Sequence, residues 1–176
     1  MDIALATRPV QPTDRTLFRR LWPRLSPDTV YRRFHAPLPG LPPETVERLV
    51  TVDHDLREAV VGLVGGEVVG VARYDRSPDD VTTAEFAILV EDAWQGVGLG
   101  RQLLIELFDL AASRGVRTLT ATVQRDNDRV IALIRRLLPG STFTPEDDVF
   151  GVVSHLPRAP ALRPARATHR NRKDMS

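Results

Sequence analysis

Apolar and polar residues alternate with a helical period in the first third of the chain. In residues 13–25, 26–35 and 43–50, apolar side chains recur every three or four positions, which is typical of helices that bury one face. A serine followed by a proline opens the second of these segments, and both suit a helix start. We therefore expect three short helices after a strand over residues 3–10.

The period then changes to that of extended chain. Valine-rich runs at 57–66 and 67–76 meet at two glycines, which predicts a β-hairpin. Residues 82–92 form a third extended run, and apolar residues alternate cleanly over 118–124. Residues 141–155 predict two strands around an acidic turn.

Two amphipathic helices lie between the later strands. Residues 99–114 carry an apolar stripe and stop at Gly115, and residues 127–138 stop at a Pro-Gly pair. The stripe of the first helix consists of Leu103, Leu104, Leu107, Leu110 and Ala111. Strands mixed with helices, without an internal repeat or a second core, predict one α/β domain.

Composition excludes several classes of site. The 176 residues include no cysteine, so the chain has no disulfide bond, thiolate metal ligand or cysteine nucleophile. No run approaches the roughly 18 apolar residues of a membrane span, and the N-terminal segment does not resemble a secretion signal. We expect a cytoplasmic protein of one domain.

The net charge of +1 hides an uneven distribution. Residues 157–176 hold six basic side chains against one acidic side chain, which leaves a net charge of −4 for the rest. This segment is rich in proline, alanine and arginine and lacks apolar periodicity. We therefore expect a folded domain over 1–156 and a disordered basic tail over 157–176. The acidic body argues against a nucleic-acid partner.

Three alternating glycines, at positions 96, 98 and 100, lie at the start of the helix predicted over 99–114. The segment 95–100, QGVGLG, joins a predicted strand to that helix. The first amide groups of a helix have no partner within it, and the helix dipole adds positive potential, so this turn suits a phosphate ligand. A P-loop would need a lysine followed by serine or threonine, and a dinucleotide fingerprint would need another glycine spacing. A glycine-rich turn without a ligand is the alternative interpretation.

The pattern Gln-x-x-Gly-x-Gly between a strand and a helix resembles the motif of the GNAT superfamily of acyl-CoA-dependent N-acetyltransferases. The order of predicted elements over residues 3–155 is similar as well. Segments 26–64 and 84–104 also resemble the catalytic domain of the bacterial Pat-type protein lysine acetyltransferases. This resemblance implies a single domain with a mixed, mostly antiparallel sheet flanked by helices.

The same resemblance implies that acetyl-CoA is the cosubstrate. Its pantetheine arm would lie along a strand and its pyrophosphate on the glycine-rich turn. The implied binding residues are Ile88, Leu89, Val90, Gln95, Gly96, Val97, Gly98, Leu99, Gly100, Arg101 and Asn127. Two of them have a second interpretation, Asn127 as a helix cap and Arg101 as a solvent-facing side chain.

Glu85 is the candidate general base. Acetyl transfer requires a neutral amine, and deprotonating a lysine of pKa about 10.4 near pH 7.4 costs about 4 kcal/mol. Glu85 stands among apolar neighbours just before the implied pantetheine site, so its pKa should be raised into the range of a useful base. The resemblance to Pat-type enzymes also implies a catalytic glutamate at this position. A solvent-facing acid on a half-exposed strand is the alternative.

Other polar candidates are weaker. The Asp-His-Asp run at 53–55 suits a second base, a substrate anchor or the border of the acceptor groove, but a plain polar turn is preferred, and we expect no metal. Many GNAT enzymes place a tyrosine near the last predicted helix as the general acid, whereas Tyr31 and Tyr74 both lie elsewhere. Arg32 and Arg33 are expected on a solvated face.

These features predict direct acetyl transfer from acetyl-CoA to a primary amine, with Glu85 as base. A protein lysine is the first choice of acceptor, from the Pat-type resemblance, and a polyamine, an aminoglycoside or an amino acid is the second. A module that senses acetyl-CoA without turnover is the alternative of another class. Both a monomer and a homodimer agree with the sequence.

Overall fold

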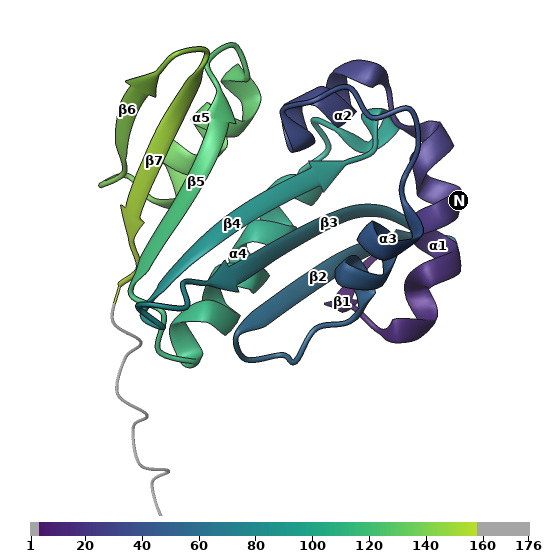
Figure 1. Ribbon diagram of the computed structural model, residues 1–176, viewed down its shortest axis with the longest axis horizontal. Helices are drawn as coiled ribbons and strands as arrows, with labels where there is room; N and C mark the ends of the chain where they lie inside the picture. The colour runs from purple at the N-terminus through teal and green to yellow at the C-terminus, as the bar shows by residue number, and fades with distance from the viewer. Residues whose placement is uncertain (1–3, 158–176) are drawn as a thin grey trace, which may run out of the picture.

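The computed structural model describes residues 4–157, which form one seven-stranded sheet with helices on both faces (Figure 1). The strands are β1 (Leu5–Pro9), β2 (Arg57–Val64), β3 (Glu67–Arg76), β4 (Thr83–Val90), β5 (Thr118–Gln124), β6 (Thr142–Glu146) and β7 (Val149–His155). The helices are α1 (Arg15–Leu21), α2 (Pro27–Phe34), α3 (Pro43–Val50), α4 (Leu99–Ser113) and α5 (Asp128–Leu137). The strand order is β1-β2-β3-β4-β5-β7-β6, and only β4 and β5 pair in parallel. The predicted single α/β domain with a mostly antiparallel sheet is therefore confirmed.

Each face of the sheet has its own hydrophobic core. Helices α4 and α5 cover one face, and α1 and α3 cover the other. A β-carbon at Gly62 of β2 would lie 2.7 Å from Leu99 Cδ1, so the helix packs this closely only because the strand has no side chain there. Within the described residues, no helix combines the length and the apolar character needed to cross a membrane.

The predicted helix over 13–25 is wrong in its extent. A 3-10 turn at Pro12–Asp14 precedes α1, and a second one follows at Trp22–Arg24. Pro23 has no amide hydrogen to continue the hydrogen-bond ladder, so regular α-helical bonding ends at Leu21. The predicted tail over 157–176 lies, apart from Pro157, outside the described residues.

The apolar stripe of α4 is confirmed in outline. Leu103, Leu104, Leu107 and Ala111 are buried, whereas Leu110 is only half-buried. Phe108 was not predicted and is buried, because it meets Phe86 of β4 edge to face at 5.1 Å between ring centroids. The helix therefore buries a wider face than one stripe.

Strands β4 and β5 stay together over only three residue pairs. Thr83, Ala84 and Glu85 pair with Thr118–Thr120, and beyond that point the two strands diverge (Figure 1). Within residues 4–157, the edge of β4 over residues 86–90 that faces β5 consequently has no strand partner, while the other edge pairs with β3. Helix α2 lies beside this part of β4.

Candidate active site

The diverging part of β4 supplies backbone groups to the site. Ile88 and Val90 are half-buried and Leu89 is buried, so these residues are held firmly by the sheet. Their register with β3 (Gly70↔Val90, Val71↔Leu89, Ala72↔Ile88) fixes the strand from one side. An extended ligand with amide groups can pair with the other side as an additional strand would.

The glycine-rich turn leads directly into α4. Gly96 and Gly98 have φ angles of 78° and 92°, a left-handed backbone region that favours glycine. Among residues 4–157, the amide groups of residues 96–98 meet no acceptor, and Leu99, Gly100 and Arg101 open the helix, where amide groups have no partner within it. Val97 and Arg101 are exposed. The turn therefore presents amide donors and a helix N-terminus to solvent, as an anion site requires.

Gln95 joins three elements at the base of this turn. Its side-chain amide donates to the carbonyl oxygen of Val90 at 3.0 Å and to Thr29 Oγ1 at 3.2 Å. Its Oε1 accepts from Arg129 at 3.0 Å. Arg129 on the first turn of α5 was missed from the sequence, because it lies 34 residues away and only the fold brings it to Gln95.

Asp92 fastens α2 to the same turn. It accepts from the amide of Ser26 at 2.9 Å and from the hydroxyls of Ser26 at 2.6 Å and Thr29 at 2.8 Å. Partial burial alone would raise the pKa of Asp92, but these hydrogen bonds outweigh it and hold the pKa below its usual range. The start of α2 is thus tied to the glycine-rich turn.

A cleft lies between β4 and β5, with α2 at its side. Phe86, Ile88 and Ala121 line it, together with Arg33 and Asn127. The side chain of Asn127 accepts from the amide of Val130 at 3.4 Å, so it caps α5 and borders the cleft at the same time.

Glu85 stands where β4 and β5 part. It lies opposite Asp75 of β3 and Thr120 of β5. Its side chain is exposed, so the apolar surroundings expected from its sequence neighbours are absent. Ala84 and Phe86 are buried on the other face of the sheet, because successive strand residues point in opposite directions.

Arg33 does not lie on the expected solvated face. It is half-buried and lines the cleft, with its guanidinium 4.8 Å from the ring centre of Phe34. Arg32 is also half-buried, and it pairs with Asp28 at 2.7 Å and with Asp126 at 3.2 Å. The second pair connects α2 to the turn before α5.

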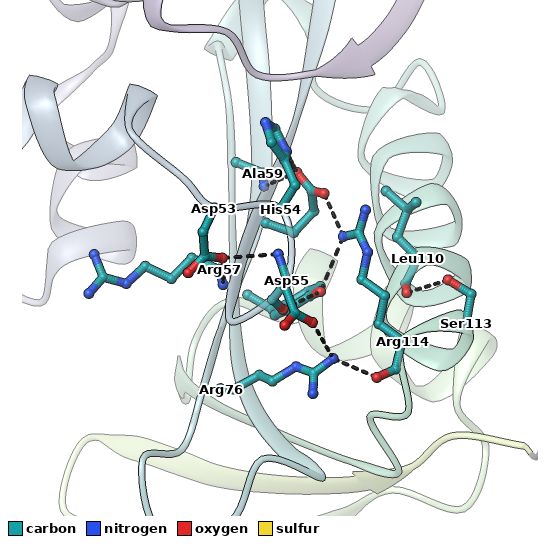
Figure 2. A network of polar contacts seen from close by, with 11 residues as sticks. Asp53, His54, Asp55, Arg57, Ala59, Arg76, Leu110, Ser113 and Arg114 are labelled. Carbon is teal, nitrogen blue, oxygen red and sulfur yellow. Dashed lines mark hydrogen bonds and ion pairs between the residues drawn. The ribbon is translucent and has the colours of Figure 1, made fainter.

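The Asp-His-Asp run at 53–55 belongs to a separate polar network (Figure 2). His54 Nδ1 lies 2.9 Å from a carboxylate oxygen of Glu58, which is fully buried. Glu58 also accepts from Arg114 at 2.5 Å, and Asp55 pairs with Arg76 at 3.2 Å. This arrangement supports the interpretation of the run as a structural turn. Among residues 4–157, no cluster of three or more histidine, cysteine or carboxylate side chains has a geometry suited to a metal.

The two tyrosines lie away from the cleft's lining. Tyr74 is fully buried, and its hydroxyl donates to the carbonyl oxygen of Asp55 at 3.1 Å and accepts from Arg114 at 3.3 Å. Tyr31 is exposed on α2. Neither borders the cleft between β4 and β5.

Comparisons with known proteins agree with this geometry. The model of the acetyltransferase (GNAT) family matches residues 16–138. Acetyltransferase PA5475 of Pseudomonas aeruginosa is 33% identical over 114 residues, which are 62% of this chain and 61% of the relative. Acetyltransferase Pat of Mycolicibacterium smegmatis is 35% identical over 153 residues, 83% of this chain and 43% of the relative. The chain thus spans less than two thirds of the length of either relative.

Among solved structures, the GNAT domain of S. lividans PAT superposes with a TM-score of 0.77 at 30% identity. The match covers 85% of this chain and 89% of that domain. The similarity therefore extends over most of this chain and most of that domain.

Proposed function

Because the chain belongs to the acetyltransferase (GNAT) family, we propose that it transfers the acetyl group of acetyl-CoA to a primary amine, with Glu85 as the general base. The observation that carries this proposal is the free edge of β4 leading into an amide-rich turn at a helix N-terminus. Bound acetyl-CoA would supply the activated thioester.

Two parts of the chain would bind acetyl-CoA, the strand β4 and the glycine-rich turn that follows it. Backbone groups of Ile88, Leu89 and Val90 would pair with the pantetheine arm, and Asn127 would meet it from α5. The amides of Gly96–Gly100 would bind the pyrophosphate, with Val97 and Arg101 at its border and Gln95 holding the turn in place. Most of these groups belong to β4 or to the helix N-termini of α4 and α5, and regular elements of this kind favour precise orientation of the thioester.

Glu85 would remove a proton from the amine, directly or through one water. Two observations support this role: Glu85 directly precedes Phe86, which lines the cleft, and its exposed side chain is open to an incoming acceptor. The chain has no cysteine for a covalent relay, so direct transfer is the proposed route. A thiol of pKa near 8.5 leaves without a strong acid, in agreement with the absence of a tyrosine from the cleft.

A protein lysine is the first acceptor that we propose, since the relatives include an acetyltransferase named Pat and the GNAT domain of S. lividans PAT. The test is free-thiol release from acetyl-CoA with lysine peptides, whole proteins and small amines. Glu85→Gln should lower the turnover number about 100-fold or more while the dissociation constant for acetyl-CoA stays the same.

Glu44→Gln is the matched control, because Glu44 is exposed on α3 and makes no contact with the cleft. Unchanged turnover in Glu85→Gln would exclude Glu85 as the base. Tight binding of acetyl-CoA without thiol release for any amine would favour an acetyl-CoA sensor over an enzyme.

A further inference from the structure

Arg33 differs from the arginines around it in having no anionic partner. Arg32 pairs with Asp28 and Asp126, and Arg73 makes two bonds to Asp75, at 3.1 and 2.9 Å. Among residues 4–157, the side chain of Arg33 meets no hydrogen-bond or ion-pair partner, although Arg33 is half-buried. Its guanidinium nitrogens still reach solvent from the cleft, so they are open to an anionic ligand.

Charged side chains of both signs surround Arg33, and the proposed base Glu85 is one of them. Burial, followed by the charge of Arg73, lowers the pKa of Arg33 to about 10, while Asp75 and Glu85 oppose this. Arg73 is buried and lines the same apolar cavity as Arg33, beside Ala87 of β4. The carboxylate of Asp75 is hydrogen-bonded to Arg73 and lies 3.8 Å from Arg57, so its direct contacts are with these two arginines and not with Arg33.

Along β4, Arg33 lies closer to the proposed base, where the acceptor would bind, than to the turn proposed for the phosphates of acetyl-CoA. It borders the cleft at Phe86, Ala87 and Ile88, one to three residues beyond Glu85, whereas the glycine-rich turn begins beyond the far end of β4. A guanidinium can bind a carboxylate through two parallel hydrogen bonds, and the side chain of Arg33 has its donors available for them.

Resting on the proposed acetyl transfer, we infer that Arg33 forms a carboxylate-binding subsite that selects acceptor amines carrying a carboxylate close to the nitrogen. The carboxylate can belong to a free amino acid or to an acidic residue beside a target lysine. Both present the same chemistry to Arg33, and the experiment separates them.

The first measurement uses the wild-type protein and two pairs of acceptors. One pair is a blocked peptide with a lysine beside aspartate and the same peptide with asparagine. The other pair is an amino acid and its amide, with rates compared per neutral amine. We expect kcat/KM to favour the carboxylate member of one pair by about tenfold, as one charge-assisted pair can provide. The pair that responds identifies the source of the carboxylate.

Variants then assign the preference to Arg33. Arg33→Met keeps most of the volume and should reduce the preference to less than about twofold, while Arg33→Lys should retain part of it as a point charge. The dissociation constant for acetyl-CoA should not change. Arg15→Met is the matched control, because Arg15 pairs with Glu47 on the exposed surface.

Equal rates for both members of each pair in the wild type would overturn the inference without any variant, and so would a preference that survives in Arg33→Met. A uniform loss for all acceptors, with an altered pH profile, would instead make Arg33 a positioning residue for Glu85. A preference for succinyl-CoA over acetyl-CoA that depends on Arg33 would place the carboxylate on the donor.

If no amine is acetylated, the proposed function fails but the subsite is still testable. Calorimetry with CoA and the acetylated forms of the two lysine peptides requires no turnover. Tighter binding of the aspartate peptide, lost in Arg33→Met, would support the subsite alone, and equal binding would reject it.

Discussion

The two ends of α4 are built in opposite ways. At its C-terminal end, Arg114 contacts the buried carboxylate of Glu58, and its carbonyl oxygen accepts from Arg76 at 2.6 Å (Figure 2). At its N-terminal end, two glycines with positive φ lead into amide groups that meet no acceptor among the described residues. The C-terminal end is bonded to side chains from β2 and β3, whereas the N-terminal end presents these backbone amide groups.

This difference separates stability from binding. A buried charge that is fully paired must keep its partners, because a lone buried charge is expensive. Open amide groups at a helix N-terminus are satisfied by water until an anion replaces it. Substitutions at the C-terminal end of α4 should therefore have the larger effect on the free energy of unfolding. Those at the N-terminal end should have a smaller effect on it, and substitutions on the backbone that meets the ligand should change affinity.

The largest effect is expected from Glu58→Ala at the C-terminal end. The change leaves Arg114 and His54 without their carboxylate and should lower the free energy of unfolding by about 3–5 kcal/mol. Urea denaturation monitored by circular dichroism measures it. Glu47→Ala, which breaks an exposed pair with Arg15, should cost less than about 1 kcal/mol. Equal losses in the two variants would mean that the network is not a stabilising centre.

A smaller effect is expected from Gly98→Ala at the other end. A β-carbon at Gly98 would meet no atom within 4 Å, so the cost comes from the left-handed backbone alone, about 1–2 kcal/mol. Thermal unfolding measures this cost. Gly40→Ala is a useful comparison, because Gly40 is equally open and does not have the positive φ that defines Gly98. A loss as small as that of Gly40→Ala would show that the turn relaxes.

Asp92→Asn tests the support of the N-terminal end. Because the pKa of Asp92 is lowered in the folded state, its contribution is present above the pKa of the unfolded chain, about 3.9, and is lost as the pH falls through the folded value. The variant should lose about 1 kcal/mol at pH 7, since the site is partly exposed, and the gap to the wild type should narrow below pH 4. Denaturation at pH 7 and pH 3 measures both values. A gap that widens in acid would contradict the assignment.

The sequence predicted the parts of this site that depend on local order. The motif at 95–100, the strand before it and the helix after it are contiguous, and all three are found where expected. Glu85 was expected among apolar neighbours, yet it is exposed, because the buried residues beside it in sequence face the other side of the sheet.

Contacts between distant segments could not be read from the pattern. Arg33 has the same local sequence character as Arg32, and only the packing of α2 against β4 separates an arginine with two carboxylates from one with none. Arg129 reaches Gln95 from α5 in the same way. The partners of these residues follow from the three-dimensional arrangement of α2, α5 and the diverging strands, which the sequence pattern alone does not give.

The smallest effect on stability, and the sharpest test of the comparison, is expected from Gly100→Ala. Gly100 is helical, and a β-carbon there would lie 3.5 Å from Ile88 Cδ1 and from Leu133 Cδ2, an ordinary contact distance. The substitution should therefore change the free energy of unfolding by less than about 1 kcal/mol, in the stabilising direction. If the pyrophosphate of acetyl-CoA lies on this backbone, the added methyl group should weaken binding by about tenfold, which corresponds to about 1.4 kcal/mol. Calorimetric titration with acetyl-CoA, on the same sample used for thermal unfolding, measures both quantities. Because the substitution should leave the fold intact, unchanged affinity would mean that the pyrophosphate does not bind at the first turn of α4.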